Sequence, residues 1–220
     1  IGTFALTFIG GGAIISTSGG NLLVIALAHG LILAVMVTSM LHISGAQFNP
    51  AVSIALASIG KQSWKHAGCF VCIQVLGAVV AAAILKAILT PGWEFANEQI
   101  GETLGRYSGT EGPALISAWR VLVLEAIAAF FLIWVIMVVC VDGKRKCTCA
   151  GIAGIAIGGV VAADILGIGP ATGASMNPAR SFGPALVAGA WTLHWCYWVG
   201  PIVGAAIAAQ TYNRIIGTTE

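Results

Sequence analysis

Charged side chains are scarce in this chain of 220 residues. Asp, Glu, Lys and Arg make up 8% of the sequence, whereas an ordinary soluble domain carries about 25%. Hydrophobic residues make up 58%, and the mean hydropathy is +0.95. This composition argues against a soluble enzyme, a disordered chain and a secreted disulfide scaffold, and it predicts a membrane protein. The net charge of +2 is too small to suggest a nucleic-acid partner.

Catalytic and metal-binding patterns are also lacking. The sequence shows no Ser-His-Asp arrangement, no metal-ligand cluster and no phosphate-binding glycine loop. Cys69 and Cys72 form a C-x-x-C pair inside an apolar run, where we interpret them as packing residues. We therefore expect no enzymatic activity, no metal and no cofactor.

Six apolar runs are long enough to cross a bilayer. A bilayer core about 30 Å thick needs about 20 apolar residues in a helix, and runs without period-two alternation argue against β-spans. The chain begins inside the first run without an initiator Met, so we expect further residues before Ile1. The six predicted spans are residues 1–18, 22–41, 64–89, 118–141, 150–167 and 193–216.

Two further apolar runs, at about 49–59 and 177–187, are too short to span the bilayer. The octapeptides at their starts, SGAQFNPA and TGASMNPA, match at a shift of 128 positions. Three spans accompany each copy, and because three is odd the second half enters the membrane from the opposite side. The sequence predicts an all-α membrane protein with six transmembrane helices and two re-entrant half helices, arranged as an inverted repeat. In this interpretation residues 1–220 form a single channel domain, with halves at about 1–89 and 118–216 joined by the loop 90–117.

The repeated Asn-Pro-Ala triplets point to a pore. Asn is a favoured N-cap, Pro is tolerated at the first helical position, and Ala is small enough for two helix ends to meet. A helix N-terminus carries about half a positive charge, so two that meet at the midplane disfavour cations there. The Asn amides can donate to a passing neutral molecule, which predicts a channel that excludes protons and ions. The residues of the two triplets are Asn49, Pro50, Ala51, Asn177, Pro178 and Ala179.

Lys and Arg are unevenly distributed between the connections. Lys61 and Lys65, residues 144–146 and Arg214 fall on one predicted side, and the acidic segment 90–117 falls on the other. The positive-inside rule makes the first side cytoplasmic. We therefore expect an integral, multi-pass protein in contact with lipid, with both termini in the cytoplasm. The sequence does not distinguish a plasma membrane from a vacuolar or other intracellular membrane.

The two motifs, HISGAQFNPAV at 42–52 and GASMNPARSFG at 173–183, resemble the major intrinsic protein (aquaporin) family, and the resemblance extends along essentially the whole chain. It implies six tilted helices, two re-entrant half helices and a homotetramer with one pore in each subunit. It also implies a supporting role for Glu125, whose carboxylate would accept hydrogen bonds from the backbone of a re-entrant loop.

The resemblance further implies a selectivity filter formed by His29, Ile165, Ala174 and Arg180. An arginine within the membrane is rare and functional, and its charge repels cations. His followed by Ile and Ala resembles the wider filters of plant tonoplast-type aquaporins. This implies conduction of water, with small neutral solutes such as ammonia or urea as further candidates. Ser181 stands where glycerol facilitators tend to carry Asp, which favours water as the main substrate.

Three alternatives stay open at this point. A glycerol or small-solute facilitator would share the same architecture. A secondary transporter also uses inverted repeats and broken helices, and a junctional membrane protein could keep the same fold with a closed pore. Asp164, beside Ile165 in the fifth run, could act in transport or simply bond to neighbouring helices.

Overall fold

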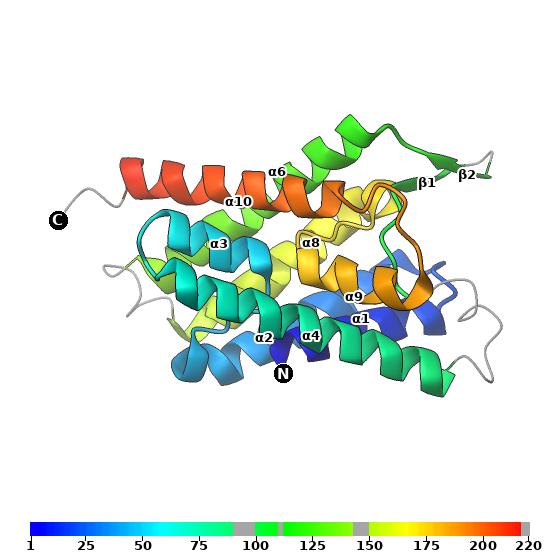
Figure 1. Ribbon diagram of the computed structural model, residues 1–220, viewed down its shortest axis with the longest axis horizontal. Coiled ribbons are helices and arrows are strands. Elements are labelled where there is room, and N and C mark those ends of the chain that lie inside the picture. The colour runs from blue at the N-terminus through cyan, green and yellow to red at the C-terminus, as the bar shows by residue number, and fades with distance from the viewer. Residues whose placement is uncertain (90–99, 110–111, 143–149, 217–220) are drawn as a thin grey trace.

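The computed structural model describes residues 1–89, 100–109, 112–142 and 150–216. Six long helices form most of this described part, and they run roughly along the length of the molecule (Figure 1). They are α1 (Gly2–Ser16), α2 (Leu22–Ser44), α4 (Trp64–Leu89), α6 (Ala118–Ile136), α8 (Ala153–Thr172) and α10 (Cys196–Ile215).

The lengths of these helices fit a multi-pass membrane protein. Among the described residues, α2, α4, α8 and the continuous helix Ala118–Val141 are long and apolar enough to cross a bilayer. The last of these joins α6 to a π-helical turn, η2 (Met137–Val141). Helix α1 is apolar but has 15 residues. Helix α10 has 20 residues and carries polar side chains towards its end, which lowers its hydropathy.

The inverted repeat is visible in the order and packing of the helices. Helix α2 spans 22–44, and α8 with the short 3₁₀ turn η3 (Ala150–Ile152) spans 150–172 at the same shift of 128 positions. Within the first half α1 packs on α4, and within the second half α6 packs on α10. Helices α2 and α8 pack on each other between the halves. The α1–α4 contact of the first half therefore corresponds to the α6–α10 contact of the second half, and the equivalent helices α2 and α8 meet each other, as an inverted repeat requires.

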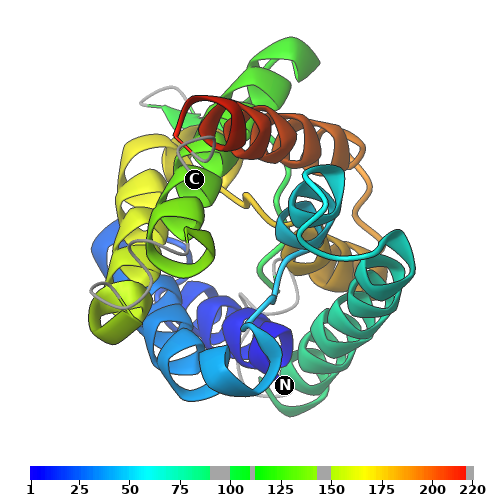
Figure 2. The same ribbon diagram turned by 90° about the vertical axis from the view of Figure 1, so that its left-hand side faces the viewer.

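The half helices α3 (Pro50–Ser58) and α9 (Pro178–Ala188) each pack against the opposite half of the chain. Helix α3 lies against α10, and α9 lies against α4. In an end-on view the long helices form a ring, and the stretches before α3 and α9 extend towards its middle (Figure 2). This exchange brings the two triplets together in the interior.

Helices α2 and α8 approach each other closely at Gly30 and Gly158. A Cβ on Gly30 would lie 2.6 Å from the carbonyl oxygen of Gly158, and a Cβ on Gly158 would collide with the carbonyl of Gly30. The two glycines are themselves related by the 128-residue repeat. Small residues at a membrane helix crossing allow the backbones to touch, so this pair sets the distance between the halves.

Several predicted boundaries are corrected by the structure. Helices α2 and α8 continue to Ser44 and Thr172, beyond the predicted ends at 41 and 167. Both end because Gly45 and Gly173 adopt left-handed backbone conformations, which terminate a helix whatever the hydropathy of its last turn. Helix α10 begins at Cys196 rather than at 193. The loop 90–117 also contains an unpredicted antiparallel hairpin, β1 (Arg106–Gly109) with β2 (Gly112–Leu115).

Candidate functional site

The two triplets begin the half helices in the same way. The side-chain Oδ1 of Asn49 accepts a hydrogen bond from the backbone N–H of Ala51 at 2.9 Å. The Oδ1 of Asn177 accepts from the N–H of Ala179 at 3.1 Å and from that of Arg180 at 3.3 Å. Both Asn residues have extended backbone and are followed by Pro at the first helical position. The predicted N-caps are therefore present in both half helices.

The Asn amide groups also join the two halves. Asn49 Nδ2 donates to the carbonyl of Met176 at 2.8 Å, and Asn177 Nδ2 donates to the carbonyl of Phe48 at 3.0 Å. Each bond thus ties one half helix to the loop that precedes the other. A side-chain amide carries two hydrogens, so each Asn keeps one further donor beside these bonds.

The loops before the triplets share an unusual backbone. Gly45 and Ala46 precede α3 with φ of 73° and 49°, and Gly173 and Ala174 precede α9 with φ of 87° and 44°. Alanine rarely adopts this left-handed region, so the surrounding structure must hold both loops. In the second loop Glu125 does so, because its carboxylate accepts hydrogen bonds from the N–H of Ser175 at 3.0 Å and from that of Met176.

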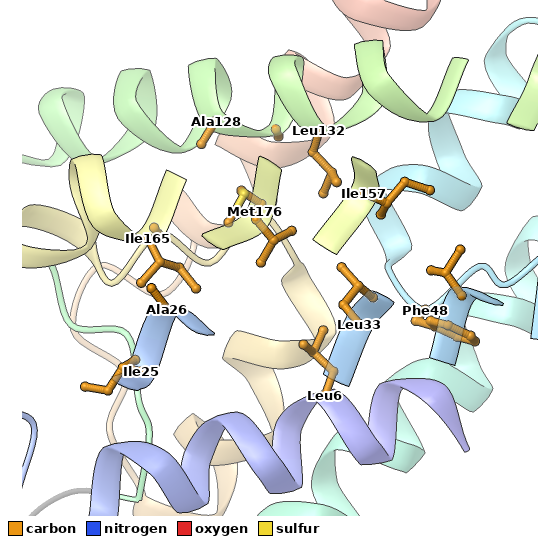
Figure 3. Close-up of a cluster of buried hydrophobic side chains, with 14 of the residues drawn as sticks. Leu6, Ile25, Ala26, Leu33, Phe48, Ala128, Leu132, Ile157, Ile165 and Met176 are labelled. Carbon is orange, nitrogen blue, oxygen red and sulfur yellow. The ribbon is translucent and has the colours of Figure 1, made fainter. Parts of the chain in front are cut away.

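A cavity of about 310 Å³ runs past the triplets. Both Asn residues line it, as do all four expected filter residues: His29, Ile165, Ala174 and Arg180. Its remaining walls are mainly apolar. Figure 3 shows buried side chains that α1, α2, α6, α8 and the loops before α3 and α9 contribute to this region. Those that line the cavity are Leu6, Leu33, Phe48, Leu132, Ile157, Ile165 and Met176.

A second cavity, of about 580 Å³, lies beside the loop 100–105. It shares two lining residues with the first cavity, Ile165 and Arg180. Ile165 and Arg180 therefore border both cavities, at the place where the filter is expected. This arrangement is what a passage needs if its constriction is bounded by a cation, an imidazole and a branched apolar side chain.

Arg180 is held in this constriction by two partners. Its Nη1 donates to the carbonyl of Gly101 at 2.7 Å, and its Nη2 lies 3.1 Å from Nε2 of His29. The Nδ1 of His29 lies 2.8 Å from the carbonyl of Ile25. A carbonyl can only accept and a guanidinium can only donate, so His29 is a neutral imidazole with its proton on Nδ1. The structure thus joins two of the four expected filter residues directly.

Sequence reasoning missed the contribution of the loop 100–105. Thr103 Oγ1 donates to Ser181 Oγ at 2.8 Å, and Ser181 Oγ lies 2.5 Å from Ser175 Oγ. This hydroxyl chain fastens the loop that supplies the Gly101 carbonyl to Arg180. Glu102 from the same loop lines the second cavity and accepts from the N–H of Ile100 at 2.6 Å. Burial raises the pKa of the Glu102 carboxyl above its usual range.

Asp164 lies apart from the passage. It lines neither cavity, and its Oδ2 is buried without a hydrogen-bond partner among the described residues. Cys69 and Cys72 are exposed on α4, where a membrane protein presents its surface to lipid. Neither side chain is therefore buried within the described part of this chain, and their interpretation as packing residues stays a prediction.

Comparisons with known proteins agree with this geometry. The family model described as "Major intrinsic protein" matches residues 1–212. Aquaporin TIP4-4 of Zea mays is 37% identical over 222 residues, covering 97% of this chain and 82% of the relative. Aquaporin NIP1-1 of Zea mays is 38% identical over 223 residues, covering 100% of this chain and 73% of the relative.

A solved structure has the same fold. The aquaglyceroporin from Plasmodium falciparum superposes with a TM-score of 0.81 and 26% sequence identity. The match covers 98% of this chain and 93% of the other.

Proposed function

The chain belongs to the major intrinsic protein family, and on this premise we propose that water is its principal substrate, with ammonia and urea as further permeant solutes. As a member of this family the chain is a passive channel for water and small solutes, and it is not an enzyme. The observation that carries the proposal is that Ile165 and Arg180 line both the cavity that holds the two Asn residues and the cavity beside the loop 100–105.

Each site residue has a distinct role in this proposal. Asn49 and Asn177 present their remaining amide hydrogens to the oxygen of the permeant molecule. The N-termini of α3 and α9 place partial positive charge beside them, which disfavours protons and cations. Pro50 and Ala51, like Pro178 and Ala179, start the half helices and let them meet. Glu125 holds the second loop in shape.

At the constriction the permeant molecule passes His29, Ile165, Ala174 and Arg180. Arg180 supplies donors and repels cations. Because the Nε2 of His29 accepts from Arg180, the pair keeps the guanidinium to one side of the passage. Ile165 and Ala174 leave an opening that is less uniformly polar than a filter of four polar groups, which favours small neutral solutes beside water.

A glycerol facilitator is the second candidate, because the structural neighbour is titled an aquaglyceroporin. Against it, Ser181 is fully buried and bonded to Thr103 and Ser175, so its surroundings fit a hydroxyl rather than a carboxylate. A coupled transporter is expected to place a carboxylate at the midplane, beside the two Asn residues. The cavity that holds both Asn residues has no carboxylate among its described lining.

We also propose that residues 1–220 form one channel domain and assemble as a homotetramer with one pore in each subunit. The connection from α3 to α4 and the last turn of α10 lie at the same end of the molecule (Figure 1). Lys61, Lys65 and Arg214 therefore mark one end, which we assign to the cytoplasm together with both termini. Residues 144–146, which supported this orientation in the sequence, lie outside the described residues.

The test is stopped-flow light scattering on proteoliposomes. We expect the protein to accelerate osmotic shrinkage over empty vesicles, and to accelerate urea and ammonia entry less strongly. Arg180→Ala should widen the filter and raise the urea-to-water permeability ratio. Arg120→Ala is the matched control, because Arg120 is exposed beside Trp119 at the protein surface. Shrinkage no faster than that of empty vesicles would refute the proposal and support a closed, junctional protein. A flux that follows a proton or sodium gradient would favour a transporter.

A further inference from the structure

Gly10 in α1 lies directly against the imidazole of His29. A Cβ built on Gly10 would stand 2.5 Å from both Cδ2 and Cε1 of His29, and closer still to Nε2. This is well inside van der Waals contact. We propose that Gly10 is a specificity-determining residue that acts by positioning His29. The proposal rests on the filter role of His29 and Arg180 proposed above.

The His29 ring cannot move aside without a consequence at the filter. Its Nδ1 is bonded to the carbonyl of Ile25 at 2.8 Å, and its Nε2 lies 3.1 Å from Nη2 of Arg180. The side chain is 3% exposed, and the open space beside it is the cavity that it lines. A methyl group on Gly10 would therefore push the ring away from α1 and towards the passage. That movement narrows the passage and removes an acceptor from Arg180.

Gly10 is the first of three consecutive glycines, and its neighbours face elsewhere. A Cβ on Gly11 would meet Leu85 Cδ1 at 2.8 Å, and a Cβ on Gly12 would meet Leu85 Cδ2 at 3.8 Å. The latter is an ordinary van der Waals distance. Both contacts belong to the packing of α1 on α4. Gly12 therefore offers a control of the same chemistry, two positions away on the same helix.

The experiment compares Gly10→Ala, Gly12→Ala, His29→Ala and the double variant G10A/H29A in proteoliposomes. We expect G10A to lower the permeability to water and to lower the permeability to urea more strongly, so that the urea-to-water permeability ratio also falls. The change should be about threefold or more, as interaction energies between residues in direct contact allow. G12A should match the parent. In the His29→Ala background the Gly10 substitution should have no further effect, because the ring that it displaces is gone.

The outcomes separate the two proposals. If G10A lowers the ratio equally with and without the His29 ring, Gly10 acts through helix packing and the inference is overturned. If His29→Ala itself leaves the ratio unchanged, the filter assignment fails instead. Should G10A not fold while the double variant does, the collision with the ring is supported. Failure of both to fold shows that α1 packing alone requires Gly10, which overturns the inference.

Discussion

Asn49 and Met176 are 127 residues apart in the chain and are joined by a 2.8 Å hydrogen bond from the Asn49 amide to the Met176 carbonyl. Asn177 and Phe48 form the counterpart bond at 3.0 Å. Each cap residue thus stabilises its own helix through its oxygen and the opposite loop through its nitrogen. The two half helices hold each other in place.

Asn49→Asp should separate these two tasks. A carboxylate still accepts from Ala51 N–H, but it cannot donate to Met176, and it leaves that buried carbonyl without this donor. We expect a loss of about 1–3 kcal/mol in the free energy of unfolding, together with a cation leak caused by negative charge near the midplane. Thermal unfolding in detergent and a dye-based ion-flux assay measure the two effects. Asn21→Asp is the control, because Asn21 caps α2 at an exposed position and Asp caps equally well. Equal destabilisation by both variants would contradict the argument.

Thr103→Val tests the loop that supports Arg180. Valine keeps the shape of threonine but removes the hydrogen bond to Ser181, at a cost of about 0.5–1.5 kcal/mol. Because the same loop carries the Gly101 carbonyl that binds Arg180, we expect a less ordered guanidinium and a higher urea-to-water permeability ratio. Thr38→Val removes a hydroxyl that bonds to the Ala34 carbonyl of its own helix at an exposed position of α2, and it should leave the ratio unchanged. If the two variants have the same urea-to-water permeability ratio, Thr103 does not support the filter.

Gly158→Ala tests the close crossing of α2 and α8. The new methyl would collide with the carbonyl of Gly30 and stand 2.8 Å from the Cβ of Ala34. Overpacking of this kind costs about 1–3 kcal/mol, which a thermal unfolding series detects. Gly159→Ala is the adjacent control, since its Cβ meets nothing within 4 Å, and it should gain up to about 1 kcal/mol from helix propensity. Similar stability of the two variants would argue against the tight crossing.

Glu102 makes stability depend on pH. Burial raises the pKa of its carboxyl above the usual value of 4.5, so the folded protein binds the proton more tightly than the unfolded chain does. The stabilisation is fully present below pH 4.5 and is lost as the pH rises through the pKa of the folded state. Glu102→Gln lacks this dependence. The difference in unfolding temperature, variant minus parent, should therefore grow between pH 4.5 and neutrality. A constant difference across that range would show that Glu102 is not perturbed. The contributions of the other titrating groups to the pH dependence cancel in this difference, because both proteins contain those groups.

The sequence predicted the main features of the fold through local patterns. Continuous apolar runs require helices in lipid, and the repeated triplets identified both half helices and their N-caps. The helix ends were less accurate, since α2 and α8 stop at left-handed Gly45 and Gly173 rather than where the hydrophobic run fades. The hairpin β1–β2 carries no distinctive pattern in the sequence and was missed.

The sequence by itself determined that this chain crosses a membrane, that its two halves are inverted copies, and that each copy starts a short helix with a capping Asn. These features follow from composition, run length and repetition, which are properties of the chain alone. Only the tertiary structure decided which groups surround the expected filter residues. The Gly101 carbonyl reaches Arg180, the bare Cα of Gly10 reaches His29, and the Thr103 hydroxyl reaches Ser181 beside Arg180, all from distant segments. Such contacts depend on how helices pack against each other, and no local periodicity encodes them.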